Sequence, residues 1–489
     1  MAVRIRLFDV LSGALVLTGG AVILSQFQQQ RRERLRDLQL ARQRGQPRQR
    51  AVVVGSGFAG LTAVNHLAAL LDGDPSTDLL LVDRQNYHLF YPLLYQVATG
   101  GVEPGSLTFA ARVVASEHGF RYLQATVKNV NLADQQLETD AGSIHYDTLI
   151  LAPGSVTNFF GMADVAQNSL PLKSLEDGMN LRNQIVDTFE RADHESDGER
   201  RRALLTFVIV GGGATGVELA ASMSDLIRRT LIPNYPTIDA EDVRLVLVEA
   251  RGALLAGWNP KMGELAAHRL HQNKVELMLN TAVSHVTDAG IETIEGVKIP
   301  SATVIWTAGI KAAPLVETLG VERERDGRVR VNDTFELPNQ PGVFVIGDAA
   351  AVRPPGCERP LPPTASVAVD EGPFAAENAL RRLHDQDPRT FEYHSRGDLV
   401  SLGRGAAAAN VLGLVFDGIP AWLVRRTVYL VYLAGLRNRA FVVLDWLFVS
   451  FHQRVIASFD GVTRGRLVLP RVAGPEGRAQ TRSRGAGGS

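Results

Sequence analysis

Short hydrophobic runs that end abruptly in glycine recur along this chain of 489 residues. The runs at 51–60 (AVVVGSGFAG) and 207–216 (FVIVGGGATG) are rich in β-branched residues and pass into helix-like sequence. Each therefore predicts a buried strand, a tight turn and a helix. A second strand follows each helix and ends in an acid, Asp83 in the first case and Glu249 in the second. This strand–helix–strand pattern, written twice, predicts two dinucleotide-binding units of the Rossmann type.

Each glycine turn has the spacing of a dinucleotide-binding fingerprint. The first glycine permits a tight turn, the second lets a pyrophosphate approach the backbone, and the third lets the helix pack closely on the strand. The helix N-terminus offers unpaired N–H groups to the anion. One such turn could be a glycine-rich bend without a ligand, but two complete copies favour binding. The predicted residues are Gly55, Gly57, Phe58, Ala59, Gly60 and Asp83 in the first copy, and Gly211, Gly213, Ala214, Thr215, Gly216 and Glu249 in the second.

The acids that end the second strands predict how the nucleotides are held. A carboxylate there can accept hydrogen bonds from ribose hydroxyls. Glu249 would also repel a 2′-phosphate, which favours NADH over NADPH, and the nearby Arg251 moderates that preference.

Three further segments distinguish the two units. The run VFVIGDA at 343–349 puts Asp348 directly after a buried strand, where its carboxylate can accept hydrogen bonds from the ribityl hydroxyls of a flavin. The runs YDTLILAPGS (146–155) and TVIWTAGI (303–310) are strands that end in small residues, and we expect them to cross between the two nucleotide domains. This asymmetry predicts two different cofactors.

Together these segments resemble the two-dinucleotide-domain flavoproteins of the glutathione reductase type. The stretches HLFYPLLYQVATGGVEP (88–104), GGGATGVELA (211–220) and LPPTASVAVDEG (361–372) resemble more closely the type II NADH dehydrogenases. The resemblance implies bound FAD, NADH as the electron donor and a membrane quinone as the acceptor, without proton pumping. The alternative is an NADH-dependent reductase of a soluble redox protein or another acceptor that is not a quinone.

The resemblance also implies an α/β fold in which an NADH domain is inserted into a discontinuous FAD domain. The FAD site would include Val127, Ala152, Gly154, Gly347, Asp348, Thr364 and Ala365, and the NADH site would include Gly309. The expected segments are an N-terminal hydrophobic helix and basic linker (1–50), the first part of the FAD domain (51–171), the NADH domain (172–317), the second part of the FAD domain (318–385), a C-terminal membrane-associating region (386–470) and a disordered tail (471–489).

The stretch 361–372 predicts a helix with prolines in its first turn, because the N–H that proline lacks would be unpaired there. In the resembling family this helix N-terminus lies at the flavin, and its pattern AQxAxQxG carries two glutamines at the quinone pocket. This chain has Ser366 and Asp370 at those positions, so the departure concerns the acceptor pocket. We predict Gln96, Ser366 and Asp370 as quinone-site residues; for Gln96 the alternative is a polar loop side chain that bonds to backbone.

Glu218 is the predicted catalytic residue. The resemblance implies that it lies near the nicotinamide and the flavin, with a role in proton transfer. The alternative is an acid that is stabilised by a helix N-terminus.

The net charge and the cysteine count exclude several classes of function. The net charge is −1, so the whole chain does not predict a nucleic-acid partner. The one cysteine, Cys357, excludes a disulfide framework or a cysteine-ligated metal site within one chain, and it argues against a sulfide or disulfide reductase. We predict no metal. A scaffold that binds nucleotides without turnover is a further alternative, and a homodimer is compatible with the sequence.

Two regions predict contact with a membrane. Residues 10–27 carry no charge and are followed by eight arginines in 28–50, which predicts one span with its C-terminal side at the cytoplasmic face of the cell membrane. An interfacial helix and a cleaved signal peptide are the alternatives. Residues 419–435 and 440–451 are apolar but interrupted by charges, which is typical of helices in the plane of the lipid interface. A buried helical hairpin is the alternative there.

Overall fold

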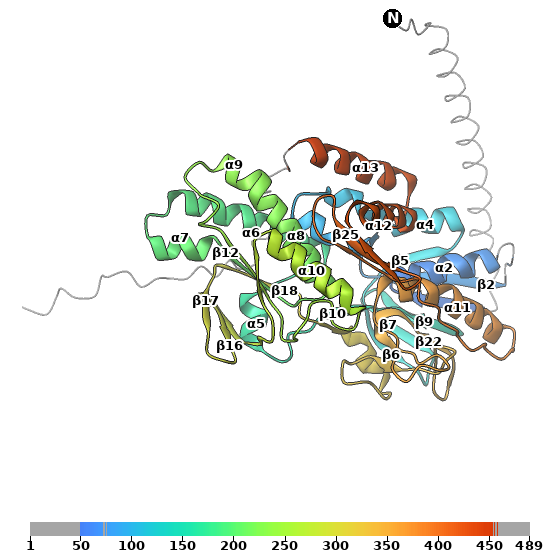
Figure 1. Cartoon of the computed structure of the whole chain (residues 1–489). Helices are drawn as coiled ribbons and strands as arrows, with labels where there is room; N and C mark the ends of the chain where they lie inside the picture. The colour runs from blue at the N-terminus through green and yellow to red at the C-terminus, as the bar shows by residue number, and fades with distance from the viewer. Residues whose placement is uncertain (1–48, 72–73, 75, 453, 455–456, 458–489) are drawn as a thin grey trace, which may run out of the picture.

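The computed structural model describes residues 49–71, 74, 76–452, 454 and 457 (Figure 1). The predicted N-terminal helix and the predicted tail at 471–489 lie outside these residues. Within the described part of the chain, no helix combines the length and the hydropathy needed to cross a bilayer.

The first sheet has six strands in the order β21-β22-β9-β1-β2-β5. Its strands from β22 to β5 are parallel, and β21 is antiparallel at one edge. Helices α2 (Phe58–Leu70) and α11 (Ala365–Leu383) cover one face with a shared apolar core. The strands are β1 (Gln49–Val54), β2 (Thr77–Asp83), β5 (Arg121–Gln124), β9 (Thr148–Leu151), β21 (Glu336–Leu337) and β22 (Gln340–Val345).

The opposite face of this sheet packs on a small antiparallel sheet of three strands. These strands are β6 (Val127–Asn131), β7 (Gln136–Thr139) and β8 (Gly142–His145). The predicted FAD-site residue Val127 is the first residue of β6. Other short elements along this part of the chain are β3 (Tyr87–Leu89), η1 (Tyr91–Leu93), α3 (Leu94–Ala98), η2 (Pro104–Ser106), β4 (Thr108–Ala110), α4 (Ala111–His118), η4 (Pro314–Leu319), β20 (Val329–Arg330), η5 (Gly347–Ala349) and β23 (Ala350–Ala351).

The second sheet has five parallel strands in the order β11-β18-β12-β13-β14. Its central strands β12 and β18 are buried along their whole length, as expected for a parallel sheet with both faces covered. The strands are β11 (Leu170–Pro171), β12 (Thr206–Val210), β13 (Arg244–Val248), β14 (Val275–Met278) and β18 (Thr303–Trp306). The surrounding elements are α5 (Ala163–Asn168), α6 (Leu175–His194), α7 (Gly198–Leu204), α8 (Ala214–Leu226), η3 (Ile227–Leu231), α9 (Ile232–Asn234), α10 (Pro260–Gln272), β15 (Val283–Thr287), β16 (Gly290–Thr293) and β17 (Lys298–Pro300).

Two short strands join the sheets, which stand side by side in Figure 1. Strand β10 (Ser155–Thr157) follows β9 of the first sheet, and β19 (Ile310–Ala312) follows β18 of the second. They pair antiparallel, with Ser155 opposite Ala312. Because each follows the carboxyl end of a parallel strand, the carboxyl edges of the two sheets meet at this crossing. The crossing predicted from 146–155 and 303–310 is therefore present.

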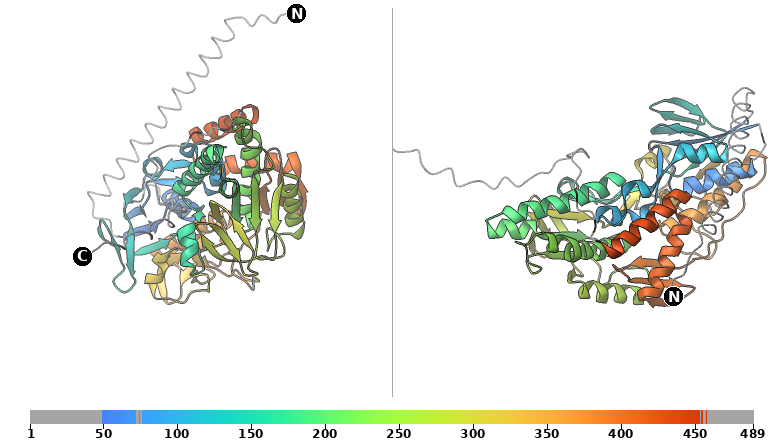
Figure 2. Two further views of the ribbon diagram at one scale, coloured as in Figure 1. Left: turned by 90° about the vertical axis from the view of Figure 1, so that its left-hand side faces the viewer. Right: turned by 90° about the horizontal axis from the view of Figure 1, so that it is seen from above.

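The C-terminal region contains a sheet as well as helices. Strands β24 (Asp398–Ser401), β25 (Ala407–Val411) and β26 (Leu414–Asp417) form an antiparallel sheet, followed by α12 (Gly418–Tyr432) and α13 (Leu436–Phe451). Ala407, Ala408 and Ala409 are fully buried. The segment from 398 to 417 therefore forms part of the folded core, whereas α13 lies at the outer surface (Figures 1 and 2).

Candidate functional site: two nucleotide cradles that meet

In the first glycine turn, two glycines pack directly against neighbouring backbone, and the third leaves space where a ligand would lie. A Cβ at Gly55 would lie 2.2 Å from the carbonyl oxygen of Ala152, and Gly55 has φ +98°. A Cβ at Gly60 would lie 1.9 Å from the carbonyl oxygen of Gly55. At Gly57, the N-cap of α2, nothing lies within 4 Å of the added Cβ. Only glycine fits the two closed positions, and the open one leaves the helix N-terminus accessible to a pyrophosphate.

Asp83 organises this turn from the end of β2. Its Oδ2 accepts hydrogen bonds from the backbone N–H of Ser56 at 2.5 Å and from the Ser56 hydroxyl at 2.8 Å. Behind the turn, the buried ring of His88 donates from Nδ1 to the carbonyl of Ser56 at 2.8 Å. Burial lowers the pKa of His88, so the neutral ring serves as a hydrogen-bond donor. This histidine lies outside both glycine motifs, so sequence reasoning did not assign it to the site.

The Gly347–Asp348 turn lies at the carboxyl end of β22, next to β9. Ser155 donates to Oδ2 of Asp348 at 2.5 Å, and the Lys173 ammonium lies 3.4 Å from the same oxygen. Gly347 has φ +69°, and its N–H donates to Oε2 of Glu371 at 2.5 Å. Burial raises the pKa of Glu371 to about 8, although the bond from Gly347 offsets part of that effect. Lys173 and Glu371 are further site residues that sequence reasoning did not assign.

Helix α11 begins beside this turn, but not as predicted. Thr364 is its N-cap, in extended conformation, and its hydroxyl accepts from the N–H of Val367 at 3.4 Å. Pro362 and Pro363 therefore precede the helix, and the prediction that they occupy its first turn is wrong. The threonine hydroxyl supplies the cap. A Cβ at Gly372 would lie 2.5 Å from the carbonyl of Ala59, so α11 packs directly against α2.

The second glycine turn repeats the geometry of the first. A Cβ at Gly211 would lie 2.7 Å from Ala308, and one at Gly216 would lie 1.9 Å from the carbonyl of Gly211. Gly213 is the N-cap of α8 and has open space around it, and Ala214 and Thr215 begin the helix.

Glu249 closes the second turn as Asp83 closes the first. Its Oε2 accepts from the N–H of Gly212 at 2.5 Å and its Oε1 from the N–H of Arg251 at 2.9 Å. Gly309 follows β18, with φ +151°, and its carbonyl accepts from the N–H of Asn158 at 3.0 Å.

The two cradles face a common region. Ala313 directly follows β19, and its N–H donates to the carbonyl of Gly154 at 3.0 Å. Gly154 follows β9 of the first sheet. Ligands of open α/β sheets bind at the carboxyl ends of the strands. The crossing thus brings the two predicted binding edges together.

Glu218 lies in α8, next to the second cradle, and is buried. Its Oε1 accepts from Nη2 of Arg425 at 2.7 Å and from the N–H of Ser401 at 2.9 Å. Burial raises the pKa of Glu218, and the Arg425 guanidinium offsets part of that rise. For Arg425, burial acts to lower the pKa but Glu218 raises it overall, so the pair is held as an ion pair.

Arg425 corrects the interpretation of the first C-terminal helix. It is one of the charges that interrupt the apolar segment 419–435, but its side chain is 4% exposed and its guanidinium stacks 4.1 Å from the ring centre of Tyr429. Tyr429 contacts Phe90 at 5.8 Å between centroids, and Phe90 contacts Phe58 at 5.6 Å. Because Phe58 begins α2, a continuous series of side chains joins Glu218 beside the second cradle to the helix start of the first.

The predicted quinone-site residues fall in two places. Gln96 lies in helix α3, donates to the Tyr95 hydroxyl at 2.9 Å and accepts from Trp446 of α13 at 2.9 Å. Its amide therefore bonds to side chains, and not to backbone as the alternative interpretation required. Ser366 and Asp370 lie on α11, where Ser366 is exposed and Asp370 pairs with Arg396 at 2.5 Å.

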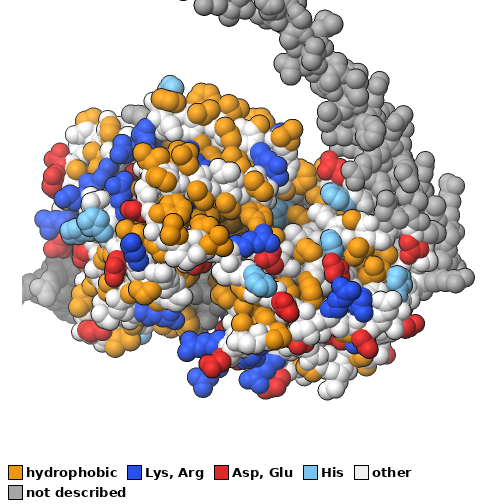
Figure 3. Space-filling view, turned by 45° about the vertical axis from the view of Figure 1, so that its right-hand side comes forward, with side chains coloured by type: hydrophobic (Ala, Val, Ile, Leu, Met, Phe, Trp, Pro, Cys, Tyr) orange, Lys and Arg blue, Asp and Glu red, His pale blue; other side chains and the backbone are white. Residues whose placement is uncertain are grey.

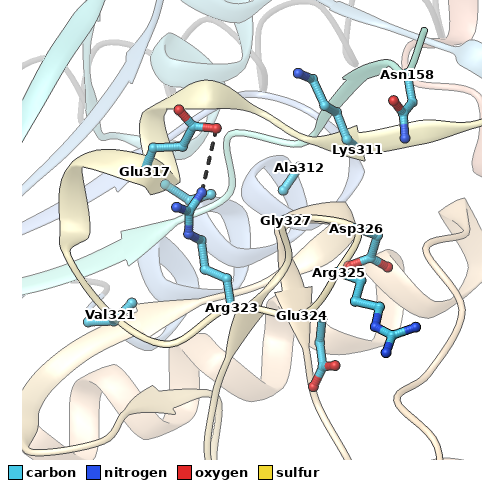
Figure 4. Close-up of a pocket in the computed structure, with 11 residues that line it drawn as sticks. Asn158, Lys311, Ala312, Glu317, Val321, Arg323, Glu324, Arg325, Asp326 and Gly327 are labelled. Carbon is cyan, nitrogen blue, oxygen red and sulfur yellow. Dashed lines mark ion pairs between the residues drawn. The ribbon is translucent and has the colours of Figure 1, made fainter. Parts of the chain in front are cut away.

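A separate pocket of about 560 Å³ lies between η4 and the hairpin at 321–327 (Figure 4). Its wall includes Lys311 and the ion pair of Arg323 with Glu317 at 3.5 Å. The wall contains none of the predicted cofactor residues, so this pocket is distinct from the cradles. Within the described residues, no group of three or more histidine, cysteine or acidic side chains could hold a metal ion.

Comparisons with known proteins agree with this geometry. The family model described as pyridine nucleotide-disulphide oxidoreductase matches residues 49–372. The "Type II NADH:quinone oxidoreductase Ndh" of Mycobacterium tuberculosis is 34% identical over 451 residues, covering 88% of this chain and 95% of that protein. NdhA of the same organism, with the same descriptive name, is 33% identical over 443 residues, covering 86% and 89%. The solved structure of NDH2 from Plasmodium falciparum in complex with NADH superposes with a TM-score of 0.77 at 18% identity, covering 84% of this chain and all of that one.

Proposed function

We infer that this chain, which belongs to the type II NADH:quinone oxidoreductase family, oxidises NADH with FAD as its bound cofactor and passes the electrons to a quinone. The broader family is that of the pyridine nucleotide-disulphide oxidoreductases. The one cysteine, Cys357, is exposed in a loop, so the chain has no pair of thiols for the disulphide reaction of that family name.

The residues of the first cradle fit FAD. The open backbone at Gly57 suits a pyrophosphate, Asp83 suits the adenosine ribose, and Asp348 suits the ribityl hydroxyls. When bound, FAD supplies a two-electron acceptor for the hydride of NADH and a donor of electrons to a quinone. The N-terminus of α11, capped by Thr364, directs its positive dipole end toward this site, which favours negative charge there.

The second cradle fits NADH. Gly213 leaves the start of α8 open for the pyrophosphate, and Glu249 is positioned for the ribose. The Glu218 carboxylate is proposed to accept a proton on Oε2, because Oε1 already receives the bonds from Arg425 and Ser401. The buried position of this acid keeps the proton away from bulk water.

One observation carries the proposal: two glycine cradles, each with its own acid, open at sheet edges that the β10–β19 pair brings together. The test is an anaerobic titration of the purified protein with NADH. We expect the flavin absorbance to bleach, and addition of a quinone to restore it. A preparation that takes up no FAD, or whose flavin is not bleached by NADH, contradicts the proposal.

The domain limits are proposed as FAD domain 51–171 and 318–385 around the NADH domain 172–317. The division of the strands between the two sheets supports these limits except at Leu170–Pro171, where β11 belongs to the second sheet although it lies before residue 172.

We also propose that α12 and α13 lie on the membrane surface. Hydrophobic side chains gather on the face seen in Figure 3. An exposed apolar face of this size with arginines beside it is typical of an interfacial helix. The exposed apolar residues of these helices include Ile419, Leu423, Val431, Leu436, Phe441, Leu444, Leu447, Phe448 and Phe451. A lipid-borne quinone fits this surface better than a soluble redox protein does.

The N-terminal span at 10–27, its location at the cytoplasmic face and the homodimer stay predictions. Protease protection in inverted vesicles tests the span, and light scattering of the detergent-solubilised protein tests the dimer.

A further inference from the structure

We propose that Arg396 is the residue that recognises the quinone in this chain, by donating a hydrogen bond from its guanidinium to a quinone carbonyl oxygen. The inference rests on the proposed function, because it concerns the acceptor side of the same reaction. It follows from what Asp370 and its neighbours contact.

Arg396 connects the flavin-side helix to the apolar face. Its Nη2 donates to Oδ1 of Asp370 at 2.5 Å, and its Nη1 donates to the Tyr432 hydroxyl at 2.6 Å. Asp370 lies in the second turn of α11, whose first residue follows the N-cap Thr364. Tyr432 is the last residue of α12, next to Val431, which is 63% exposed. The guanidinium therefore lies between the helix that starts at the FAD site and the proposed lipid surface.

A quinone that binds beside Asp370 needs a hydrogen-bond donor for its carbonyl oxygen. A quinone carbonyl only accepts hydrogen bonds, and an ionised carboxylate only accepts them as well. Asp370 therefore cannot bind the carbonyl in its charged form. An arginine carries five N–H donors, and the two bonds to Asp370 and Tyr432 leave others to bind the quinone.

The ion pair of Arg396 with Asp370 serves more than the stability of the fold. The Arg396 side chain is 58% exposed, and an ion pair this exposed contributes little to folding. Asp370, at 18% exposure, and the Tyr432 hydroxyl instead hold the two terminal nitrogens of the guanidinium in place. A fixed guanidinium also stabilises the negative charge that develops on a carbonyl oxygen as it gains electrons.

The test uses the full-length, FAD-loaded enzyme in detergent with ubiquinone-1 as the acceptor. We expect Arg396→Gln to raise the KM for ubiquinone-1 about tenfold, the cost of losing a hydrogen bond from a charged donor. The rate of anaerobic flavin bleaching by NADH is recorded for every variant to separate the two halves of the reaction. Arg359→Gln, at an exposed arginine in the 353–361 loop, is the matched control and should leave the KM unchanged.

A second variant makes the result specific to recognition. Asp370→Gln places an amide hydrogen-bond donor on α11. Arg396→Gln should therefore raise the KM for ubiquinone-1 much less in the Asp370→Gln background than in the wild type. The proposal is overturned if Arg396→Gln raises the KM by the same factor in both backgrounds, or if it does not raise the KM at all. A change in FAD content or in NADH-driven bleaching that matches the rise in KM would mean a structural role and also overturns it. If the wild type bleaches with NADH but reduces no quinone, the proposed function fails instead.

Discussion

Glu371 is a buried acid beside the Gly347–Asp348 turn, and it sets a dependence of stability on pH. Its pKa lies at about 8 because burial penalises the charged form, against an ordinary value of 4.5. A pKa that is raised on folding means that the folded state binds the proton more tightly. This group's contribution to stability is therefore fully present below pH 4.5 and is lost as the pH rises through 8.

The variant Glu371→Gln tests this dependence. Its amide oxygen can still accept from the Gly347 N–H, but it does not titrate. Each unit of pKa shift corresponds to about 1.4 kcal/mol, so we expect the unfolding free energy of the wild type to fall by a few kcal/mol more than that of the variant between pH 5 and 8. Urea denaturation at both pH values measures it, with the exposed Glu358→Gln as control. If the unfolding free energies of the wild type and of Glu371→Gln fall by the same amount between the two pH values, the raised pKa of Glu371 is contradicted.

Glu249 is expected to set the choice between NADH and NADPH. Glu249→Gln removes the charge that opposes a 2′-phosphate but keeps an oxygen for the Gly212 N–H. We expect kcat/KM for NADPH to rise about tenfold, with a smaller change for NADH. Steady-state rates with both nucleotides measure it. An unchanged ratio of the two kcat/KM values would show that Glu249 does not discriminate.

At the residue scale, the sequence predicted those positions whose role follows from local chain geometry. The glycines at 60 and 216 are required by backbone contacts within one strand–turn–helix unit, with Gly55 and Gly211. The motif spacing also located Gly55 and Gly211, although their own close contacts are with the chain after β9 and β18. Arg425 and Lys173 were missed because their partners, Glu218 and Asp348, lie more than 170 residues away in the chain. No spacing within a motif encodes such pairs.

At the element scale, the buried pair of Glu218 and Arg425 holds α8 and α12 together. Arg425→Met would leave the carboxylate buried without its partner, which costs about 3–5 kcal/mol. The double variant Glu218→Gln/Arg425→Met carries no unpaired charge and should recover most of the lost unfolding free energy. Urea denaturation of the two variants measures the difference. Equal destabilisation of single and double variants would mean that packing of the arginine, not its charge, matters.

The element boundaries show where local signals compete. The prolines at 362 and 363 predicted a helix start, yet the helix begins after Thr364, because a hydroxyl cap satisfies N–H groups that a proline only omits. The sheet at 398–417 was missed because its alanine-rich strand β25 has little β propensity, and burial against α12 and α10 determines its conformation.

At the scale of the whole molecule, the proposed membrane surface can be located by fluorescence. A tryptophan in place of Phe448, which is 63% exposed on α13, should be quenched by brominated lipids in vesicles. A tryptophan in place of Ile294, 69% exposed on the turn between β16 and β17, should not be quenched. Quenching of each variant is compared with that of the wild type, because the chain already carries four tryptophans, with Trp422 on α12 and Trp446 on α13 among them. Equal quenching at both positions would contradict the proposed orientation.

The arrangement of two nucleotide sheets followed from the repeated pattern, because a parallel strand, a glycine turn and a helix admit few topologies. The way in which the C-terminal region closes over both halves could not be predicted from the sequence. It depends on side chains from α3, α8 and α11 that meet α12, α13 and the segment before β24 only after folding.

Three residue pairs, between β10 and β19, link the two halves at their functional edges. Ser155 bonds to Asp348, but its neighbour Val156 and the opposite residue Lys311 carry no predicted ligand contact. Mutation at those two positions could tilt one half against the other while leaving each nucleotide's affinity intact. A lineage could in this way retune the distance for electron exchange, and hence turnover, without touching a single cofactor ligand.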